Sequence, residues 1–276
     1  MAKRKKVRMA GTPETGYLVE AAIYTPPHPN DGPRVRAEKC RMSSLYRQTM
    51  NDLTARRRLE FLIAMNFVLT DLFFTLTYRD ADLPYTREEA REKIAKFLTA
   101  LRLWRKKQGL TLKYIYVIEH KHGDGRFHHH LIINATERDM ETIRALWVYG
   151  DVCDMEYLGS REYEDWAGYM TKEGVEGRPV GERMWIPSKN LEKPIERTTY
   201  VSDDETLDFP AVAGVVRLAS KEATERDANF RYIKYRIPPR YNQRETAHEG
   251  RAWEPEGPPL LSDLKGGITF RQGRRK

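Results

Sequence analysis

The sequence predicts an α+β fold with a ferredoxin-like split βαβ core, in which a four-stranded antiparallel sheet carries its helices on one face. Two observations predict it. Segments with strand and helix patterns follow one another in the order β-α-β-β-α-β over residues 71–158. A further segment with helical spacing follows the fourth strand, over residues 160–174. We therefore expect one regular domain that ends in a helix.

Each predicted element has its own signal. Thr86 and Glu89 have the spacing of a capping box, and apolar residues follow them at helical spacing. Runs that are rich in β-branched and aromatic residues predict the strands. In chain order, the predicted elements are a helix over 43–67, a strand over 71–78, a helix over 86–109, strands over 111–119 and 126–133, a helix from Thr136, a strand over 151–158 and a helix over 160–174.

Proline placement predicts the domain limits. Of 15 prolines, five lie in residues 13–33, five lie in 238–259, and only Pro84 lies between 35 and 178. Proline interrupts regular structure, so irregular segments are expected on both sides of one compact domain. The prediction is a basic, Pro-rich N-terminal arm at 1–42, the regular domain at 43–195, an extension of unknown role at 196–236, and a flexible polar tail at 237–276.

Composition excludes several classes of protein. The 276 residues include 48 Lys and Arg against 40 Asp and Glu, a formal net charge of +8, which favours polyanionic partners. Two cysteines cannot build a disulfide framework, so a reducing cytoplasm is expected. The longest apolar stretch, 59–76, is interrupted by Glu60, Asn66 and Asp71, so we expect no membrane span. No GxxxxGK[ST] motif is present, which excludes the usual motor and kinase chemistries.

Five of the seven histidines lie between residues 120 and 130. Side chains alternate along a strand, so His128 and His130 of RFHHHLII point to the same face. Glu119 ends the neighbouring strand of the hairpin, so its carboxylate can reach the same place. Two imidazoles and a carboxylate suit Mn²⁺, Mg²⁺ or Zn²⁺. The alternative is that these histidines are solvated side chains at a hairpin end. His129 faces the other way and is expected to be structural, and His120 and His122 are expected to be solvated in the turn.

A tyrosine and a lysine lie in the last predicted helix. Tyr169 and Lys172, in EDWAGYMTKEG, are three residues apart and therefore share a helix face. An ammonium group beside a phenol stabilises the phenolate, which is the nucleophilic form. Tyr and Lys at this spacing also occur in many helices without any function, so this pair carries weight only in combination with the histidine strand.

The combination resembles the HUH superfamily of single-stranded DNA nicking enzymes, and within it the rolling-circle replication initiators of phages and plasmids. Three motifs occur in that family's order: FFTLTY at 73–78, FHHHLII at 127–133 and YMTKE at 169–173. The stretches NFVLTDLFFTLTY (66–78) and WIPSKNLEKP (185–194) are similar to the initiators related to the filamentous-phage gene-II type. The resemblance spans about residues 45–195.

The resemblance implies a role for each matched residue. His128, His130 and Glu119 would be ligands of Mn²⁺ or Mg²⁺, Tyr169 the nucleophile and Lys172 the assisting cation. Thr75 and Thr77 of the first motif would lie near the DNA backbone or support the site. The implied activity is a metal-assisted nick of single-stranded DNA at a replication origin, which leaves a 5′-phosphotyrosine link and a free 3′-OH.

The implied setting is the cytoplasm of a bacterial host, with the host helicase and polymerase as partners. Basic residues that could contact DNA include 3–6, Arg34, Arg36, Lys39, Arg41, 56–58 and the C-terminal RQGRRK. Three alternatives stay open. They are a single-tyrosine HUH transposase, a non-catalytic RNA-binding module on the same kind of sheet, and a structural metal-binding hairpin without activity.

Overall fold

The computed structural model describes residues 3–26, 45–120, 125–172, 182–225 and 228–239. The chain divides into two compact units, each described here by itself. One unit comprises Val35–Lys193, and the other combines Met1–Arg34 with Pro194–Lys276. No helix in the described ranges combines the length and the apolar character needed to cross a lipid bilayer.

The Val35–Lys193 unit contains a five-stranded antiparallel sheet with the strand order β6-β3-β5-β4-β7. Its elements are α1 (Leu45–Asn66), β3 (Leu72–Leu76), α2 (Arg87–Lys107), β4 (Tyr114–Glu119), β5 (His128–Ile133), α3 (Asp139–Leu146), β6 (Val152–Tyr157), α4 (Tyr163–Met170) and β7 (Ile186–Pro187), with short 3₁₀ turns at Asp80–Asp82 and Leu158–Ser160. The predicted α+β class is confirmed. The strand count differs, because the two-residue strand β7 pairs with β4 as a fifth member.

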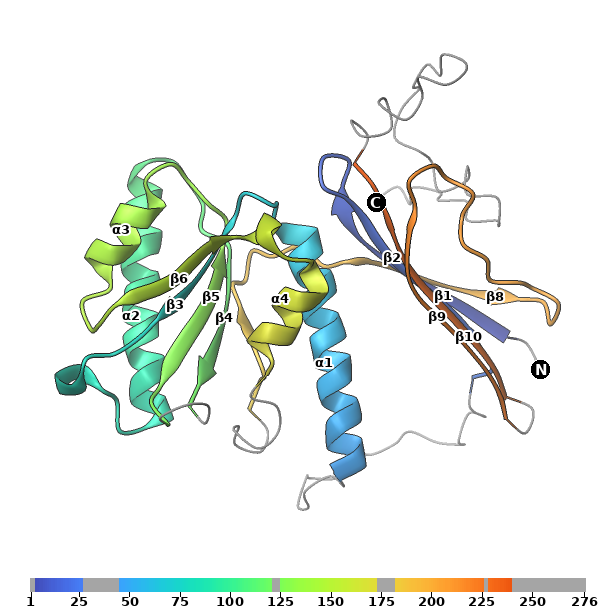
Figure 1. Ribbon diagram of the computed structural model, residues 1–276, viewed down its shortest axis with the longest axis horizontal. Coiled ribbons are helices and arrows are strands. Elements are labelled where there is room, and N and C mark those ends of the chain that lie inside the picture. Colours follow the sequence, from blue (N-terminus) through green and yellow to red (C-terminus); the bar gives the residue numbers. More distant parts are fainter. Residues whose placement is uncertain (1–2, 27–44, 121–124, 173–181, 226–227, 240–276) are drawn as a thin grey trace, which may run out of the picture. The chain divides into compact units, whose positions relative to one another are not determined.

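Alternation along the strands divides this sheet into two faces. Leu72, Phe74 and Leu76 of β3 pack with Phe97 of α2 and Ile143 of α3 in one apolar cluster. Figure 1 shows α2 and α3 together on this face and α4 on the opposite one. The predicted one-sided arrangement therefore applies to the two crossover helices. The helix after the fourth strand covers the other face, and that is the face on which the histidine strand presents its predicted ligands.

The capping signal of the second predicted helix is also confirmed. Thr86 is the N-cap of α2, and its side chain accepts a hydrogen bond of 3.1 Å from the backbone N–H of Glu89. The helix ends close to Gly109, where φ is +72° and a Cβ would meet no atom within 4 Å, so glycine is used here for its backbone conformation.

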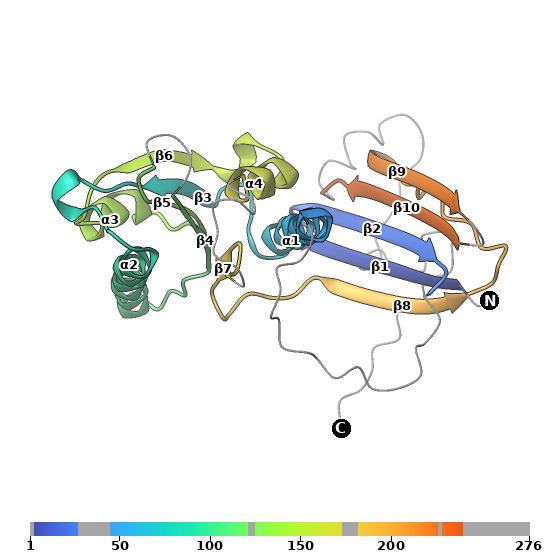
Figure 2. The ribbon, with the colours of Figure 1, turned by 90° about the horizontal axis from the view of Figure 1, so that it is seen from below.

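The second unit is a five-stranded antiparallel sheet whose strands lie side by side in the order β8-β1-β2-β10-β9, as Figure 2 shows. They are β1 (Lys3–Thr12), β2 (Gly16–Tyr24), β8 (Ile195–Val201), β9 (Val216–Glu225) and β10 (Ala228–Ile237). Val19, Ile233 and Tyr235 form the centre of its core, and Leu207 and Phe209 from the β8–β9 connection pack against it.

This sheet differs from the expected arm at 1–42 and extension at 196–236. Pro13 lies in the β1–β2 turn and Pro26 follows β2, so these prolines mark strand ends. The four consecutive basic residues at the start of β1 do not show the apolar–polar alternation that predicts a strand. The partner strand of β1, β8, is nearly two hundred residues away in the sequence. Patterns among neighbouring residues therefore predict neither the strand β1 nor its pairing with β8. Beyond Pro239, the predicted tail lies outside the described residues.

Candidate functional site

Three buried polar side chains from three adjacent strands meet on the α4 face of the sheet. Glu119 ends β4, His130 lies in β5 and Thr75 lies in β3, and at most 5% of each is exposed. The Nε2 atom of His130 is hydrogen-bonded to Oε2 of Glu119, and its Nδ1 atom lies 2.9 Å from Oγ1 of Thr75. Both ring nitrogens of His130 are thus engaged, and Thr75 holds the ring so that Nε2 faces the carboxylate.

This arrangement suits a metal site in part. An imidazole nitrogen and a carboxylate oxygen directed at one point are suitable donors, and a hydrogen bond to the other ring nitrogen is the usual way to orient a metal-binding histidine. His128 is half-buried and directly opposite Glu119 in the β4–β5 register, so it shares their face. Among the described residues, however, no group of three His, Cys, Asp or Glu side chains lies close enough to hold a metal ion.

The middle histidine points into the opposite face, as strand alternation predicts. His129 is fully buried, and its Nε2 atom lies 2.5 Å from the hydroxyl of Tyr78, with Trp147 packed edge-on against the ring. Burial, together with the charges of His130 and His128, lowers the pKa of His129 to about 3. His129 is therefore a neutral core residue. His120 stacks on Phe127 with 4.0 Å between ring centroids, and His122 lies outside the described residues.

The predicted tyrosine and lysine lie at the same site. The ring of half-buried Tyr169 stands edge-on to His130, with 5.2 Å between centroids. The Nζ atom of Lys172 lies 4.4 Å from the centre of the Tyr169 ring and 3.2 Å from Oε1 of Glu119. The predicted helix over 160–174 is shorter in the structure, because α4 ends at Met170. Lys172 therefore reaches the tyrosine from the turn after the helix.

The Glu119 carboxylate contacts both His130 and Lys172. Burial raises its pKa, but the hydrogen bond with His130 and the charges of His130 and Lys172 outweigh burial, so the net pKa lies below the ordinary value. The ionised carboxylate at neutral pH is the form that can bind a cation. The site thus combines an anionic oxygen, an imidazole, a phenol and an ammonium group within contact distance.

Two neighbours of Tyr169, and one of Gly168, were not predicted as site residues. Phe73 packs edge-on against Tyr169 at 5.4 Å and stacks on His130 at 5.9 Å. Its strand alternation with Thr75 would have placed it on this face. The guanidinium of Arg161 lies 5.4 Å from the Tyr169 ring centre, and Nη2 of Arg56 lies so near Gly168 that a Cβ there would be 2.0 Å away. No sequence signal links either arginine to Tyr169, although Arg56 belongs to the run predicted to contact DNA.

Tyr163, the other tyrosine of α4, lies in different surroundings from Tyr169. Tyr163 is only 9% exposed, and its hydroxyl donates a hydrogen bond of 3.3 Å to the backbone carbonyl of Phe67. Tyr163 therefore packs between α4 and the end of α1, while Tyr169 faces the histidine.

The second threonine of the first motif occupies a different place. The hydroxyl of Thr77 donates to the backbone carbonyl of Asp151 at 3.2 Å and accepts from its N–H at 3.3 Å. These contacts join the end of β3 to the segment before β6. Thr77 thus supports the sheet, whereas Thr75 contacts a predicted ligand directly.

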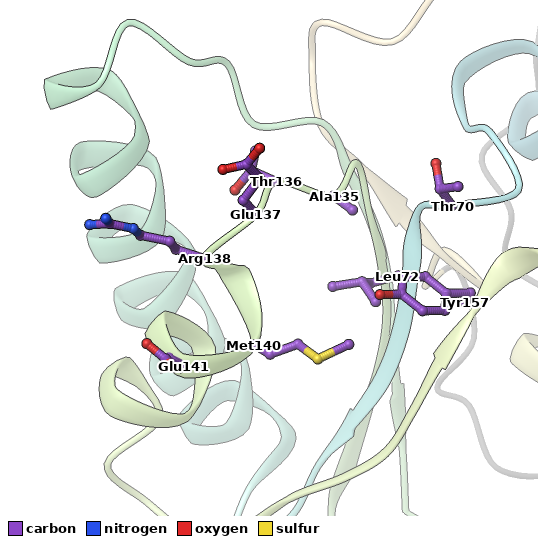
Figure 3. A pocket seen from close by; sticks show the side chains of 9 residues that line it. All are labelled: Thr70, Leu72, Ala135, Thr136, Glu137, Arg138, Met140, Glu141 and Tyr157. Carbon is purple, nitrogen blue, oxygen red and sulfur yellow. The ribbon is translucent and has the colours of Figure 1, made fainter.

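An open hollow lies elsewhere on this unit. It has a volume of about 740 Å³ and lies between the start of β3, the end of β6 and the N-terminal end of α3. Figure 3 shows Met140 extending toward Leu72 and Tyr157, whereas Arg138 extends in the opposite direction. None of the predicted site residues lines this hollow. We therefore place the candidate site at the Glu119–His130–Tyr169 cluster.

The predicted basic flanks are described only in part. Arg56, Arg57 and Arg58 are exposed on α1, and the basic run at 3–6 lies in β1. Arg34, Arg36, Lys39, Arg41 and the C-terminal RQGRRK lie outside the described residues.

Comparison with known proteins supports a replication role. Residues 71–174 match the model of a family described as replication-associated protein, of the ORF2 and gene II protein type. The matched segment contains the whole cluster, from Thr75 to Lys172, and covers less than half of the chain. Neither the curated proteins nor the solved structures yield a match to this chain. The family match supports a Rep-type replication initiator and implies a part in DNA replication.

Proposed function

We propose that the protein is a replication initiator that nicks single-stranded DNA at an origin by tyrosine transesterification. One observation carries the proposal: Tyr169 lies against His130, and Lys172 contacts both the Tyr169 ring and the carboxylate that is bound to His130. A nucleophile, a candidate cation-binding pair and an ammonium group are thus in contact, although they come from different elements.

The chemistry follows from these groups. The Tyr169 oxygen attacks the scissile phosphorus, and the bond between phosphorus and the 3′ oxygen breaks. The phenol gives up its proton and the departing 3′ oxygen takes one up, so the products are a 5′-phosphotyrosine and a free 3′-OH. Lys172 lies over the Tyr169 ring and would stabilise the negative charge that develops during the attack. The reverse attack by a 3′-OH reseals a strand, so no nucleotide cofactor is required.

A divalent cation, Mn²⁺ or Mg²⁺, fits the same proposal. Glu119 and His130 would hold it, with His128 as the third ligand from the same sheet face, and it would withdraw charge from the phosphate. The host polymerase would extend the 3′-OH, and a host helicase would separate the strands. Arg161 and Arg56, beside Tyr169 and Gly168, are suited to bind the phosphates that flank the scissile bond.

The test is formation of a covalent adduct. Wild-type protein, incubated with 3′-labelled single-stranded oligonucleotides that contain the origin and with Mn²⁺, should give a shifted band on a denaturing gel. Tyr169→Phe removes one oxygen, so DNA binding and the fold should persist while the adduct and the nick disappear. Tyr163→Phe is the matched control and should retain the adduct, because its hydroxyl faces the Phe67 carbonyl.

The ligands are tested in the same assay. Chelation with EDTA should abolish cleavage, and Mn²⁺ should restore it at least as well as Mg²⁺. His128→Ala combined with His130→Ala should be inactive. An adduct that persists in Tyr169→Phe, or undiminished nicking in EDTA, would contradict the proposal.

A further inference from the structure

One face of the second sheet is basic. It is the face that includes Arg4, Lys6 and Arg8 of β1, and we call it the basic face. Residues directly opposed across an antiparallel sheet share a face, so the strand register identifies its other members. A row is the set of residues that lie directly opposite one another across the strands, and four rows pass through Arg4, Lys6, Arg8 and Ala10 of β1. These rows carry six basic residues (Arg4, Lys6, Arg8, Lys221, Lys234 and Arg236) and two acidic ones (Glu20 and Glu196).

The two acidic residues are bound within the face itself. Glu20 accepts a hydrogen bond of 2.7 Å from Nη1 of Arg8 and one of 3.2 Å from the hydroxyl of Tyr232. Glu196 accepts from Nε of Arg8 at 2.6 Å and pairs with Lys6 at 3.1 Å. Arg8 and Lys6 thus neutralise both carboxylates. Half-buried Arg4 and exposed Lys221 add positive charge to the same face, which favours a polyanion.

An aromatic row crosses the same face. Tyr200, Arg4, Tyr24 and Phe230 are directly opposed on four neighbouring strands. Strands lie about 4.8 Å apart, so the row extends over roughly 14 Å. The Arg4 guanidinium lies 5.2 Å from the centre of the Tyr200 ring and donates to its hydroxyl at 3.0 Å. This row places flat side chains at the spacing of adjacent strands.

Two members of the row are open to solvent. Tyr200 is 70% exposed and Phe230 is 38% exposed, so both rings are accessible to a base. Phe230 is also nearly parallel to Tyr232 in the next row, with 6.4 Å between centroids and 7° between ring planes. Exposed rings beside basic side chains are the two features that bind single-stranded nucleic acid without sequence preference, because bases stack on the rings and phosphates contact the cations.

We propose that the basic face binds single-stranded DNA, with bases stacked on Tyr200 and Phe230 and phosphates bound by Arg4 and Lys221. The choice of DNA rests on the proposed function, and the binding chemistry rests on the sheet alone. The face would hold an exposed strand by a second contact, separate from the cluster at Tyr169. Stacking is tolerant of base identity, so this contact adds affinity for any exposed strand.

The test measures binding by fluorescence anisotropy with the full chain carrying Tyr169→Phe, so that cleavage does not intervene. The probe is a labelled oligodeoxythymidine of about 20 nucleotides. Tyr200→Ala and Phe230→Ala should each weaken binding roughly tenfold, as loss of one stacking contact does. Tyr200→Phe keeps the ring and should bind within about twofold of the parent. Lys221→Gln should reduce the slope of log affinity against log salt by about 0.7.

Tyr85→Ala is the matched control, because Tyr85 is 94% exposed in the other unit and should have no effect. Unchanged binding in both alanine variants, equal affinity for blunt duplex, or tighter binding of oligouridine than of oligodeoxythymidine would overturn the inference. Its failure is distinguishable from failure of the nicking proposal. With Tyr169 intact, the Tyr200→Ala/Phe230→Ala variant should still form the covalent adduct at saturating oligonucleotide.

Discussion

Replacing Arg105 should strongly destabilise the Val35–Lys193 unit. Arg105 lies in α2 and is fully buried, as is its partner Asp139, and Nη2 of Arg105 donates to Oδ2 of Asp139 at 2.7 Å. The same guanidinium donates to the carbonyl of Thr111 at 3.1 Å and to both the side-chain and backbone oxygens of Asn134. It therefore ties α2 to α3 and to the ends of β4 and β5.

The magnitude follows from what Arg105→Met leaves behind. Methionine fills a similar volume, so the cavity contribution is small, but the Asp139 carboxylate stays buried without its counter-charge. Removing one partner of a buried pair costs about 3–5 kcal/mol of unfolding free energy. Arg105→Met/Asp139→Asn removes the isolated charge and keeps an oxygen for the backbone N–H of Thr136. We expect the double variant to recover on the order of 1–3 kcal/mol.

The assay is urea unfolding at pH 7, followed by tryptophan fluorescence. Four of the five tryptophans lie at residues 104, 147, 166 and 185, so the signal reports mainly on this unit. Lys106→Met is the matched control, because Lys106 is the exposed neighbour in the same helix, and it should change stability by less than about 0.5 kcal/mol. A loss below about 1 kcal/mol for Arg105→Met, or a double variant no more stable than the single one, would refute this reasoning.

Two further predictions concern the site and the second sheet. Thr75→Val keeps the shape of the side chain but removes the hydrogen bond to Nδ1 of His130. The metal concentration needed for half-maximal cleavage should therefore rise about 10–100-fold, and the buried ring nitrogen that loses its partner should cost about 1–3 kcal/mol of unfolding free energy. An unchanged metal dependence would show that Thr75 does not orient the ring. Burial raises the pKa of Tyr235 to about 12, so the unfolded chain loses this proton at lower pH than the folded chain, and stability should fall as pH rises from about 10 to 12. Tyr235→Phe should reduce that loss in urea unfolding at pH 9 and 11, and identical alkaline losses in both proteins would contradict it.

The core elements were predictable because their signals are local. Period-two patterns and the Thr86 capping box placed every strand and α-helix between residues 45 and 170, with differences only at the ends. The second sheet was not predictable in this way. Its strand β1 begins with four basic residues, and its pairing with β8 spans the whole of the other unit, so no neighbouring residues reveal the partner. A strand on a basic face has the same composition as a solvated arm.

The candidate site was predictable where the alternation of side chains along a strand determines which face of the sheet a residue occupies. Successive side chains of β5 point to opposite faces, so His130 and His129 lie on different faces of the sheet. The structure places His130 beside Glu119 and His129 against Tyr78. Alternation does not determine how far a side chain reaches, and the described residues do not bring His128 into a three-ligand group. The position of Lys172 was also beyond prediction, because its approach to Tyr169 depends on where α4 ends.

The position at which α4 ends brings Lys172 into the Glu119–His130–Tyr169 cluster. If the helix continued, Lys172 would project from the Tyr169 face at helical spacing and its charge would lie along the helix surface. With α4 ending at Met170, Lys172 turns back so that its ammonium group lies over the tyrosine ring and against Oε1 of Glu119. One cation then lies beside both the phenol and the carboxylate. Under the proposed function, the same ammonium group would contact the nucleophile and the carboxylate that holds the cation.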